Sequence, residues 1–205
     1  MKNSVMKKLL IAALLGLAAF NVAAEKADAN KVATIEYDDA LANQVNQTVT
    51  LTGNVIVTKG TLLLKADKAV YKDTDDGITV VLNAAPGKLA TFRQKRDGGP
   101  DLWVEGEAQR IEYDERSSMV KLFGRAKIRQ MEGGRMTDET QSEFISYDNL
   151  REIFVSRNDA GGASKPGAGR GRMIIAPRKP RAAGAAPAAP AAPVSPATAA
   201  PTGTP

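Results

Sequence analysis

Alternation of apolar and polar residues dominates the chain between residues 32 and 156. From Val49 to Val57 the apolar residues occupy every second position, and threonines and Asn54 fill most of the positions between them. A period of two is the pattern of a strand with one buried face. The pattern recurs every 8 to 12 residues or so, and no window shows an apolar stripe of helical period. The chain is therefore predicted to be all-β.

A glycine-centred strand is the recurring unit. The segment Leu51–Val57 has Gly53 at its centre, and Leu122–Ile128 repeats the alternation around Gly124. A glycine inside a strand pattern predicts a β-bulge or a close approach of two backbones. Lys59-Gly60 predicts a tight turn that brings the chain back as a hairpin.

The tyrosines indicate that the unit is used in two similar halves. They end comparable strands, at spacings of 34, 42 and 34 residues: Tyr37, Tyr71, Tyr113 and Tyr147. The residues around Tyr37 and Tyr113 are nearly the same, and each segment leads to a glycine-centred strand. We interpret the tyrosines as the rim of a strand core, with direct contact to a ligand as the alternative.

The first 24 residues have the pattern of a signal peptide. Three lysines precede an apolar run over residues 9–20, and Val22-Ala23-Ala24 supplies small residues before Glu25. The run is short for a membrane-spanning helix, which needs about 20 apolar residues. We expect cleavage before Glu25 and export to the periplasm.

Composition excludes several classes of chemistry. The chain has no cysteine and no histidine, which rules out Ser-His-Asp and Cys-His catalysis and removes the commonest transition-metal ligand. We expect no catalytic residue, no metal site and no cofactor. The net charge is +5, but seven basic residues and one acid lie within residues 157–205, and the body carries both signs. A body without a basic face argues against nucleic-acid binding.

The composition changes after Val155. Residues 158–205 are first basic and then rich in alanine and proline, and we expect them to be disordered because they have little to bury. Met173–Ile175 is an apolar island that either forms a last edge strand or has no structure. The tail is interpreted as a solvated linker, with binding to an anionic surface or peptidoglycan as the alternative. The predicted domain covers residues 25–157.

An ordered series of motifs resembles a known family. The segment Leu51-Thr52-Gly53-Asn54-Val55-Ile56-Val57-Thr58, then Gly60, Ala66-Asp67-Lys68 and Pro86-Gly87-Lys88-Leu89-Ala90-Thr91-Phe92, is similar to the OstA-like family of periplasmic lipopolysaccharide-transport proteins. The resemblance covers roughly Ala33 to Val155. It implies a twisted antiparallel β jelly roll that is not an enzyme, and whose groove shields the acyl chains of lipid A while the sugars stay in water.

Inward positions of the predicted strands are the candidates for contact with lipid, and core packing is the alternative at each one. These candidate lining residues are Ile35, Val55, Val57, Leu62, Leu64, Phe92, Tyr113, Leu122 and Phe144.

Unpaired strands are expected at both ends of the sheet, near Val32–Tyr37 and near Glu152–Val155. Complementary edges would allow head-to-tail homo-oligomers. The resemblance implies that the same edges bind inner-membrane LptC-like and outer-membrane LptD-like proteins. Two other components of such a system remain as alternatives: the membrane-anchored partner and the amino-terminal domain of the outer-membrane one. A periplasmic glycan-active enzyme is a further alternative, although Glu105 and Glu107 alternate as on a solvated strand face.

Overall fold

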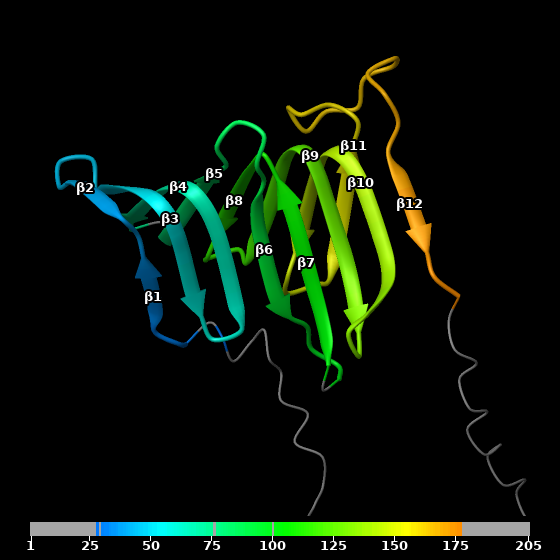
Figure 1. The fold of residues 1–205 in the computed structure, drawn as a ribbon, viewed down its shortest axis with the longest axis horizontal. Helices are drawn as coiled ribbons and strands as arrows, with labels where there is room; N and C mark the ends of the chain where they lie inside the picture. The colour runs from blue at the N-terminus through cyan, green and yellow to red at the C-terminus, as the bar shows by residue number, and fades with distance from the viewer. Residues whose placement is uncertain (1–27, 29, 76, 100, 178–205) are drawn as a thin grey trace, which may run out of the picture.

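Twelve antiparallel strands form one continuous sheet in the computed structural model, which describes residues 28, 30–75, 77–99 and 101–177 (Figure 1). The predicted all-β fold is confirmed. Within the described residues, no helix is long and apolar enough to cross a membrane. The strands are β1 (Ala33–Glu36), β2 (Asp39–Asn43), β3 (Thr48–Lys59), β4 (Leu62–Thr74), β5 (Gly77–Asn83), β6 (Ala90–Lys95), β7 (Leu102–Ala108), β8 (Arg110–Asp114), β9 (Met119–Glu132), β10 (Arg135–Asp148), β11 (Ile153–Arg157) and β12 (Arg172–Ile175).

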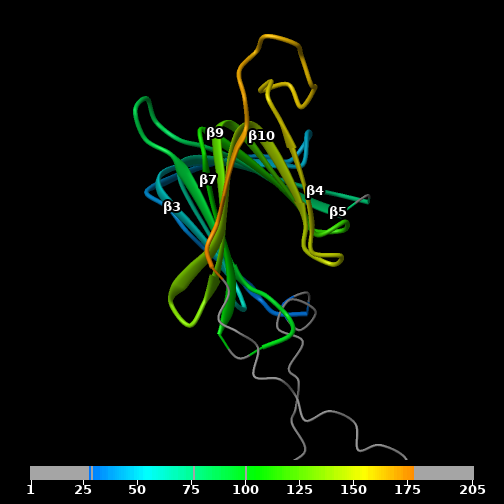
Figure 2. The same cartoon turned by 90° about the vertical axis from the view of Figure 1, so that its right-hand side faces the viewer.

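The sheet bends into two layers because four long strands take part in both. Each of β3, β4, β9 and β10 pairs with one short strand along one half of its length and with another along the other half. The short strands β1, β6, β7 and β12 mark the first layer, and β2, β5, β8 and β11 mark the second. Figure 2 shows the two layers meeting along one side and diverging toward the other.

The bends coincide with bulges at the two glycines that the sequence singles out. Gly53 has φ +77° and Gly124 has φ +70°, and the residues that follow them, Asn54 and Arg125, also have positive φ. The pairing of β3 with β4 and of β9 with β10 shifts by one residue at these points. The predicted bulges are confirmed, and each one lets a long strand pass from one layer to the other.

The order of pairing repeats once along the chain. Strand β4 pairs with β3, β5 and β6, and β10 pairs in the same way with β9, β11 and β12. The predicted two halves are therefore confirmed as β1–β6 and β7–β12. They are joined through β5 with β8 in the second layer and β6 with β7 in the first.

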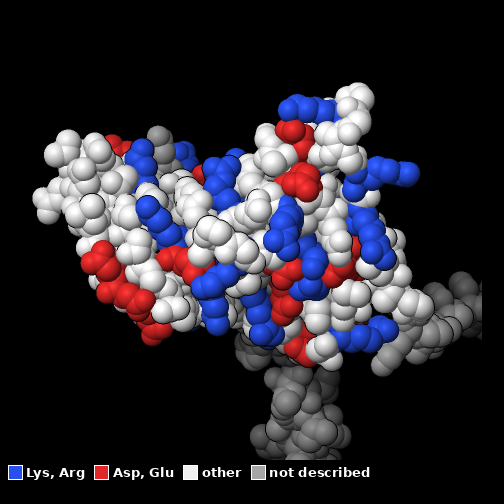
Figure 3. All heavy atoms as spheres, turned by 45° about the horizontal axis from the view of Figure 1, so that its top comes forward, with Lys and Arg blue, Asp and Glu red and all other residues white. Residues whose placement is uncertain are grey.

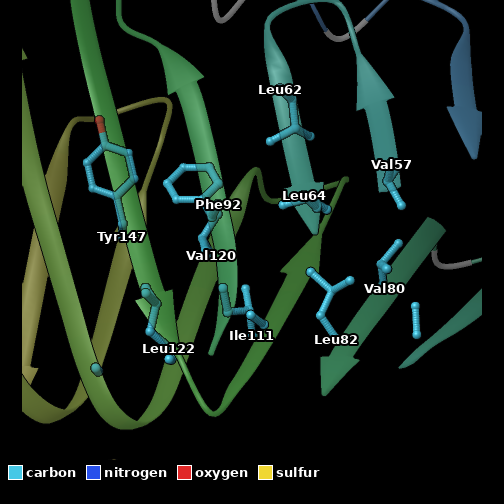
Figure 4. Packing of buried hydrophobic residues seen from close by; sticks show 14 of the residues in the cluster. Val57, Leu62, Leu64, Val80, Leu82, Phe92, Ile111, Val120, Leu122 and Tyr147 are labelled. Atoms are coloured by element: carbon cyan, nitrogen blue, oxygen red, sulfur yellow. The ribbon is translucent and has the colours of Figure 1, made fainter. Parts of the chain in front are cut away.

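A single apolar core fills the space between the layers. Figure 4 shows side chains from both layers pointing into this space, among them Phe92 of β6, Leu122 of β9 and Tyr147 of β10. The buried apolar residues are Leu51, Val55, Val57, Leu62, Leu64, Ala69, Val80, Leu82, Ala90, Phe92, Val104, Ala108, Ile111, Val120, Leu122, Ala126, Ile128, Ile145 and Tyr147.

The ends of the sheet differ in part from the prediction. The first strand is shorter than Val32–Tyr37, and the last predicted strand, near Glu152–Val155, is observed as β11. The apolar island Met173–Ile175 lies within β12, which pairs with β10, so the sheet extends beyond the boundary expected at residue 157. The predicted signal peptide and the Ala/Pro-rich end of the tail lie outside the described residues.

Candidate functional site

The predicted lining residues converge on the interior between the layers. Six of them are buried in one apolar cluster: Val55, Val57, Leu62, Leu64, Phe92 and Leu122. Ile35 and Tyr113 are partly buried and pack against that cluster. The first layer supplies Phe92 from β6, and the second supplies Tyr113 from β8. The structure thus joins residues distant in sequence into one apolar wall, as the alternation predicts.

Phe144 is the exception, and its predicted inward orientation is wrong. It lies outside the buried cluster and opposite Phe123 of β9, with the two ring centroids 5.1 Å apart in an edge-to-face arrangement. The Arg110 guanidinium lies 4.0 Å from the centroid of the Phe123 ring on the same outer surface. The register shift between Ser142 and Phe144 changes which residues of β10 face inward, so that Ile145 takes the position expected for Phe144.

The tyrosines occupy different environments, so the prediction of a uniform rim holds only in part. Tyr37 is exposed, and the Tyr71 hydroxyl donates a hydrogen bond to Asp73 at 3.3 Å. Tyr147 is fully buried in the core. Burial, followed by the charges of Asp28 and Asp114, raises the pKa of Tyr113 to about 12. The Tyr113 phenol therefore stays neutral at physiological pH.

Apolar side chains are exposed to solvent at both ends of the sheet. At the first end, Val32 beside β1 and Leu41 of β2 are 87% and 70% exposed. At the other end, Ile153 of β11 and Met173 and Ile175 of β12 are more than half exposed. Exposed apolar residues on unpaired strands are the usual mark of an edge that pairs with another chain.

Polar side chains join the two layers on the side where they diverge. Lys59, at the end of β3, forms an ion pair with Glu115, which follows β8. Gln94 of β6 accepts a hydrogen bond of 2.8 Å from the Asn149 side chain. Sequence reasoning missed these contacts, although Gln94 interrupts the apolar alternation set by Ala90 and Phe92 and is a recognisable signal.

A third contact of this kind lies beside the other two. The Arg96 guanidinium donates to Glu152 at 2.6 Å and to Gln130 at 3.2 Å. Burial favours the neutral form of Arg96, but the hydrogen bond and charge of Glu152 and the contact with Tyr147 outweigh it and raise its pKa. We call the six residues of the three bridges the mouth: Lys59, Gln94, Arg96, Glu115, Asn149 and Glu152.

Charges on the outside of the first layer form ion pairs between neighbouring strands. Glu105 of β7 lies 3.3 Å from Arg93, and Glu107 lies 2.7 Å from Lys127 of β9. Figure 3 shows acidic and basic side chains interspersed on the surface. The glutamates considered for glycan chemistry therefore belong to a solvated, paired face. Among the described residues, no group of three or more acidic side chains is placed to hold a metal ion.

A bent antiparallel sheet with a continuous apolar interior and a free strand edge at either end defines a β jelly roll. Residues 34–152 match the model of the family described as LptA/(LptD N-terminal domain) LPS transport protein. The chain belongs to this family, as the motif series around Gly53 predicts.

Similar proteins agree with the assignment. The lipopolysaccharide export system protein LptA of Escherichia coli K12 is 32% identical over 145 residues, which are 67% of this chain and 73% of that protein. The LptA of Haemophilus influenzae is 28% identical over 70% of this chain and 80% of its own length. The crystal structure of Pseudomonas aeruginosa LptH, described as the LptA homologous periplasmic component of the lipopolysaccharide transport device, superimposes with a TM-score of 0.63 at 24% identity, covering 73% of this chain and 99% of LptH.

These comparisons confirm three predictions: the family, the all-β fold, and a transport role in place of an enzymatic one. The periplasmic location stays a prediction. They also favour the predicted lipopolysaccharide transport over the glycan-active alternative. The residues that contact lipid and the individual partner proteins stay predictions.

Proposed function

We propose that the protein carries lipopolysaccharide through the periplasm by holding its acyl chains between the two layers. The observation that carries this proposal is the apolar interior, which continues from the β1 and β2 edge to the β11 and β12 edge. Each acyl methylene removed from water contributes about 0.8 kcal/mol, so shielding ten of them is worth roughly 8 kcal/mol. No ionisable or catalytic group is needed for such a site.

The proposed lining residues are the eight candidates that face the interior or pack against it. Phe92 is central among them, because it is fully buried at the junction of the two halves and its Cα lies opposite Gly106. A Cβ at Gly106 would lie 2.8 Å from Leu122 and 3.2 Å from the Phe92 ring. Because Gly106 has no side chain, the side chains of Phe92 and Leu122 can occupy the space beside it.

Photo-crosslinking at Phe92 tests the proposal. A photoreactive phenylalanine analogue at position 92 should form adducts with lipopolysaccharide in cells, and the same analogue at Trp103, whose side chain packs under Arg93 on the outer face at 4.2 Å, should form far fewer. Mass spectrometry of gently purified protein should find co-purified lipopolysaccharide. A folded Phe92 variant without adducts would contradict the assignment of Phe92.

We further propose that copies of this chain, and LptC-like and LptD-like proteins at the two membranes, join through the edge strands. The internal junction supplies the template: β5 pairs with β8, and β6 with β7. By the repeat, β11 and β12 of one molecule would pair with β2 and β1 of the next. Transferred residue by residue, this register places Arg157 opposite Asp39, Val155 opposite Leu41, Arg172 opposite Glu36 and Met173 opposite Ile35.

The domain boundaries follow from the same proposal. We propose that residues 1–24 are a signal peptide and that the transport domain begins near Glu25. Because β12 supplies one of the two edge strands at the far end, the domain includes Arg172–Ile175.

A further inference from the structure

The interior is closed in this structure, although acyl chains must enter it. The buried lining residues are each at most 5% exposed and pack against one another in one cluster. Entry of acyl chains therefore requires the two layers to separate. The layers cannot part where they meet, since β3, β4, β9 and β10 run continuously through both. They can part only on the diverging side, where the mouth residues join them.

The bridges of the mouth are asymmetric in burial. The Lys59 side chain is 12% exposed and its partner Glu115 is 27% exposed. Arg96 is 16% exposed and its partner Glu152 is 34% exposed. In both pairs the cation is held more deeply than the carboxylate. The carboxylates can turn into water while the cations stay beside the interior.

Two buried polar atoms lack a hydrogen bond in the closed arrangement. Arg96 Nε and Asn149 Oδ1 have no partner among the described residues. A small cavity of about 20 Å³ lies behind the Lys59–Glu115 and Gln94–Asn149 bridges, lined by Leu62 and Tyr113 on the core side and by Asp28, Lys59, Glu115 and Asn149 among others on the mouth side. The mouth thus combines polar atoms that lack a hydrogen bond with a gap in the packing between the layers.

We propose that the mouth recognises the phosphorylated headgroup of the lipid. The lipid phosphates replace the carboxylate of Glu115 as the partner of Lys59, and that of Glu152 as the partner of Arg96. This exchange opens the interior to the acyl chains. The inference rests on the proposed function. Guanidinium and ammonium groups are the standard protein ligands of phosphate. In the closed state the carboxylates hold both cations in place, so the closed mouth is preformed for an anion. The phosphates would lie at the diverging side and the acyl chains behind them, next to Leu62.

Lipid A species with two phosphates and with none provide the test. Trapping by the photoreactive analogue at position 92 is measured for each species in mixed micelles, using full-length mature protein. We expect the wild-type mouth to favour the diphosphorylated species at least tenfold. The variant Lys59→Gln/Arg96→Gln should lose this preference. The control Arg93→Gln, which removes a cation from an outer ion pair within one layer, should keep it.

A second variant separates recognition from loss of folding. Glu115→Gln/Glu152→Gln removes both competing carboxylates, so we expect diphosphorylated lipid A to be trapped at least fivefold more strongly than by the wild type. A destabilised protein would trap both lipid species more strongly, so a gain confined to the diphosphorylated species reports recognition. Cross-linking the layers through Lys59→Cys/Glu115→Cys with a thiol-bridging reagent should block trapping, and this pair would contain the only thiols because the chain has no cysteine.

The possible failures are distinguishable. If the wild type traps both lipid species equally, or if the cross-linked protein traps lipid as well as the open one, the role of the mouth is overturned and the carrier function stands. If the wild type traps neither species, the assignment of Phe92 and the inference fail; if in addition no lipopolysaccharide co-purifies with the protein, the carrier function fails as well.

Discussion

At the scale of single residues, Gly53 shows how one position fixes the bend. Its φ of +77° disfavours any residue with a side chain, and a Cβ there would lie 2.1 Å from Asp38 Oδ2 and 2.7 Å from Asp38 Cβ. Gly87 has a similar φ of +82°, but a Cβ there would meet nothing within 4 Å. The two glycines share a positive φ, which would strain a residue with a side chain, and they differ in the space around them.

We therefore expect Gly53→Ala to destabilise the protein by more than Gly87→Ala does. The backbone strain costs about 1 to 2 kcal/mol at either position, and the displacement of Asp38 adds roughly 1 kcal/mol or more at Gly53. Urea unfolding followed by circular dichroism measures both. Equal losses would show that Asp38 moves away freely and that the close packing over the bulge contributes little.

At the same scale, the sequence predicts the core better than the mouth. Val55, Leu64 and Phe92 can be assigned to the core because an apolar residue at every second position has one physical explanation, burial. Lys59 and Glu152 are ordinary charged residues in turns, and nothing in their local sequence shows that a residue more than 50 positions away lies opposite. Only the bend of the sheet brings such pairs together.

At the scale of elements, the turn between β10 and β11 depends on Asp148. Its Oδ1 accepts hydrogen bonds of 3.0 Å from the backbone amides of Leu150 and Arg151, and its Oδ2 accepts one of 2.9 Å from the Arg151 guanidinium. Burial raises the pKa of Asp148, but these hydrogen bonds and the Arg151 charge outweigh it and lower the pKa below its ordinary value.

This shift predicts an acid-dependent loss of stability. A carboxylate with a depressed pKa stabilises the fold above its unfolded pKa of about 3.9, and the contribution disappears as the pH falls through the folded value. Asp148→Asn should cost about 1 kcal/mol near neutral pH, because the amide oxygen still accepts from the backbone but the charge is lost. Urea unfolding at about pH 6 and pH 3 should show this difference shrinking in acid; a constant difference would contradict the role of the charge.

Strands could be predicted where apolar and polar residues alternate along one segment, and they were predicted less well at the bulges. The hairpin of β3 and β4 follows from its alternation and from Gly60. Phe144 was misplaced because the one-residue shift opposite Gly124 exchanges the two faces of β10, and no apolar pattern marks the point of exchange. The sequence did not decide whether β12 forms, because Met173–Ile175 is too short to show an alternation of apolar and polar residues.

At the scale of the whole molecule, the sheet has a free strand edge at either end. Each half has two edge strands on either side. The internal junction pairs β5 with β8 and β6 with β7, so among the described residues β1, β2, β11 and β12 each keep one edge without a partner strand. Inside the chain, Asn83 of β5 lies opposite Arg110 of β8. At the equivalent positions, the register taken from that junction places Arg157 of one molecule opposite Asp39 of the next. This register brings the exposed Val155 and Leu41 together, and it places the exposed Met173 opposite the partly buried Ile35.

Charge exchange at this pair tests the head-to-tail register. Asp39→Arg and Arg157→Glu should each weaken concentration-dependent association by about fivefold, since an exposed pair replaced by like charges costs roughly 1 kcal/mol. The double variant Asp39→Arg/Arg157→Glu should restore wild-type association, because every junction then carries the pair in reverse. Sedimentation velocity over a range of protein concentrations measures all three variants.

An equimolar mixture of the two single variants separates this register from a general effect of charge. When molecules of Asp39→Arg and Arg157→Glu alternate along a filament, every junction joins opposite charges: one kind of junction keeps the native pair, and the next carries it in reverse. Like charges meet only where two copies of the same variant join. The mixture should therefore associate more strongly than either variant alone at the same total concentration. A mixture that associates no better than its components would place positions 39 and 157 apart and overturn the register.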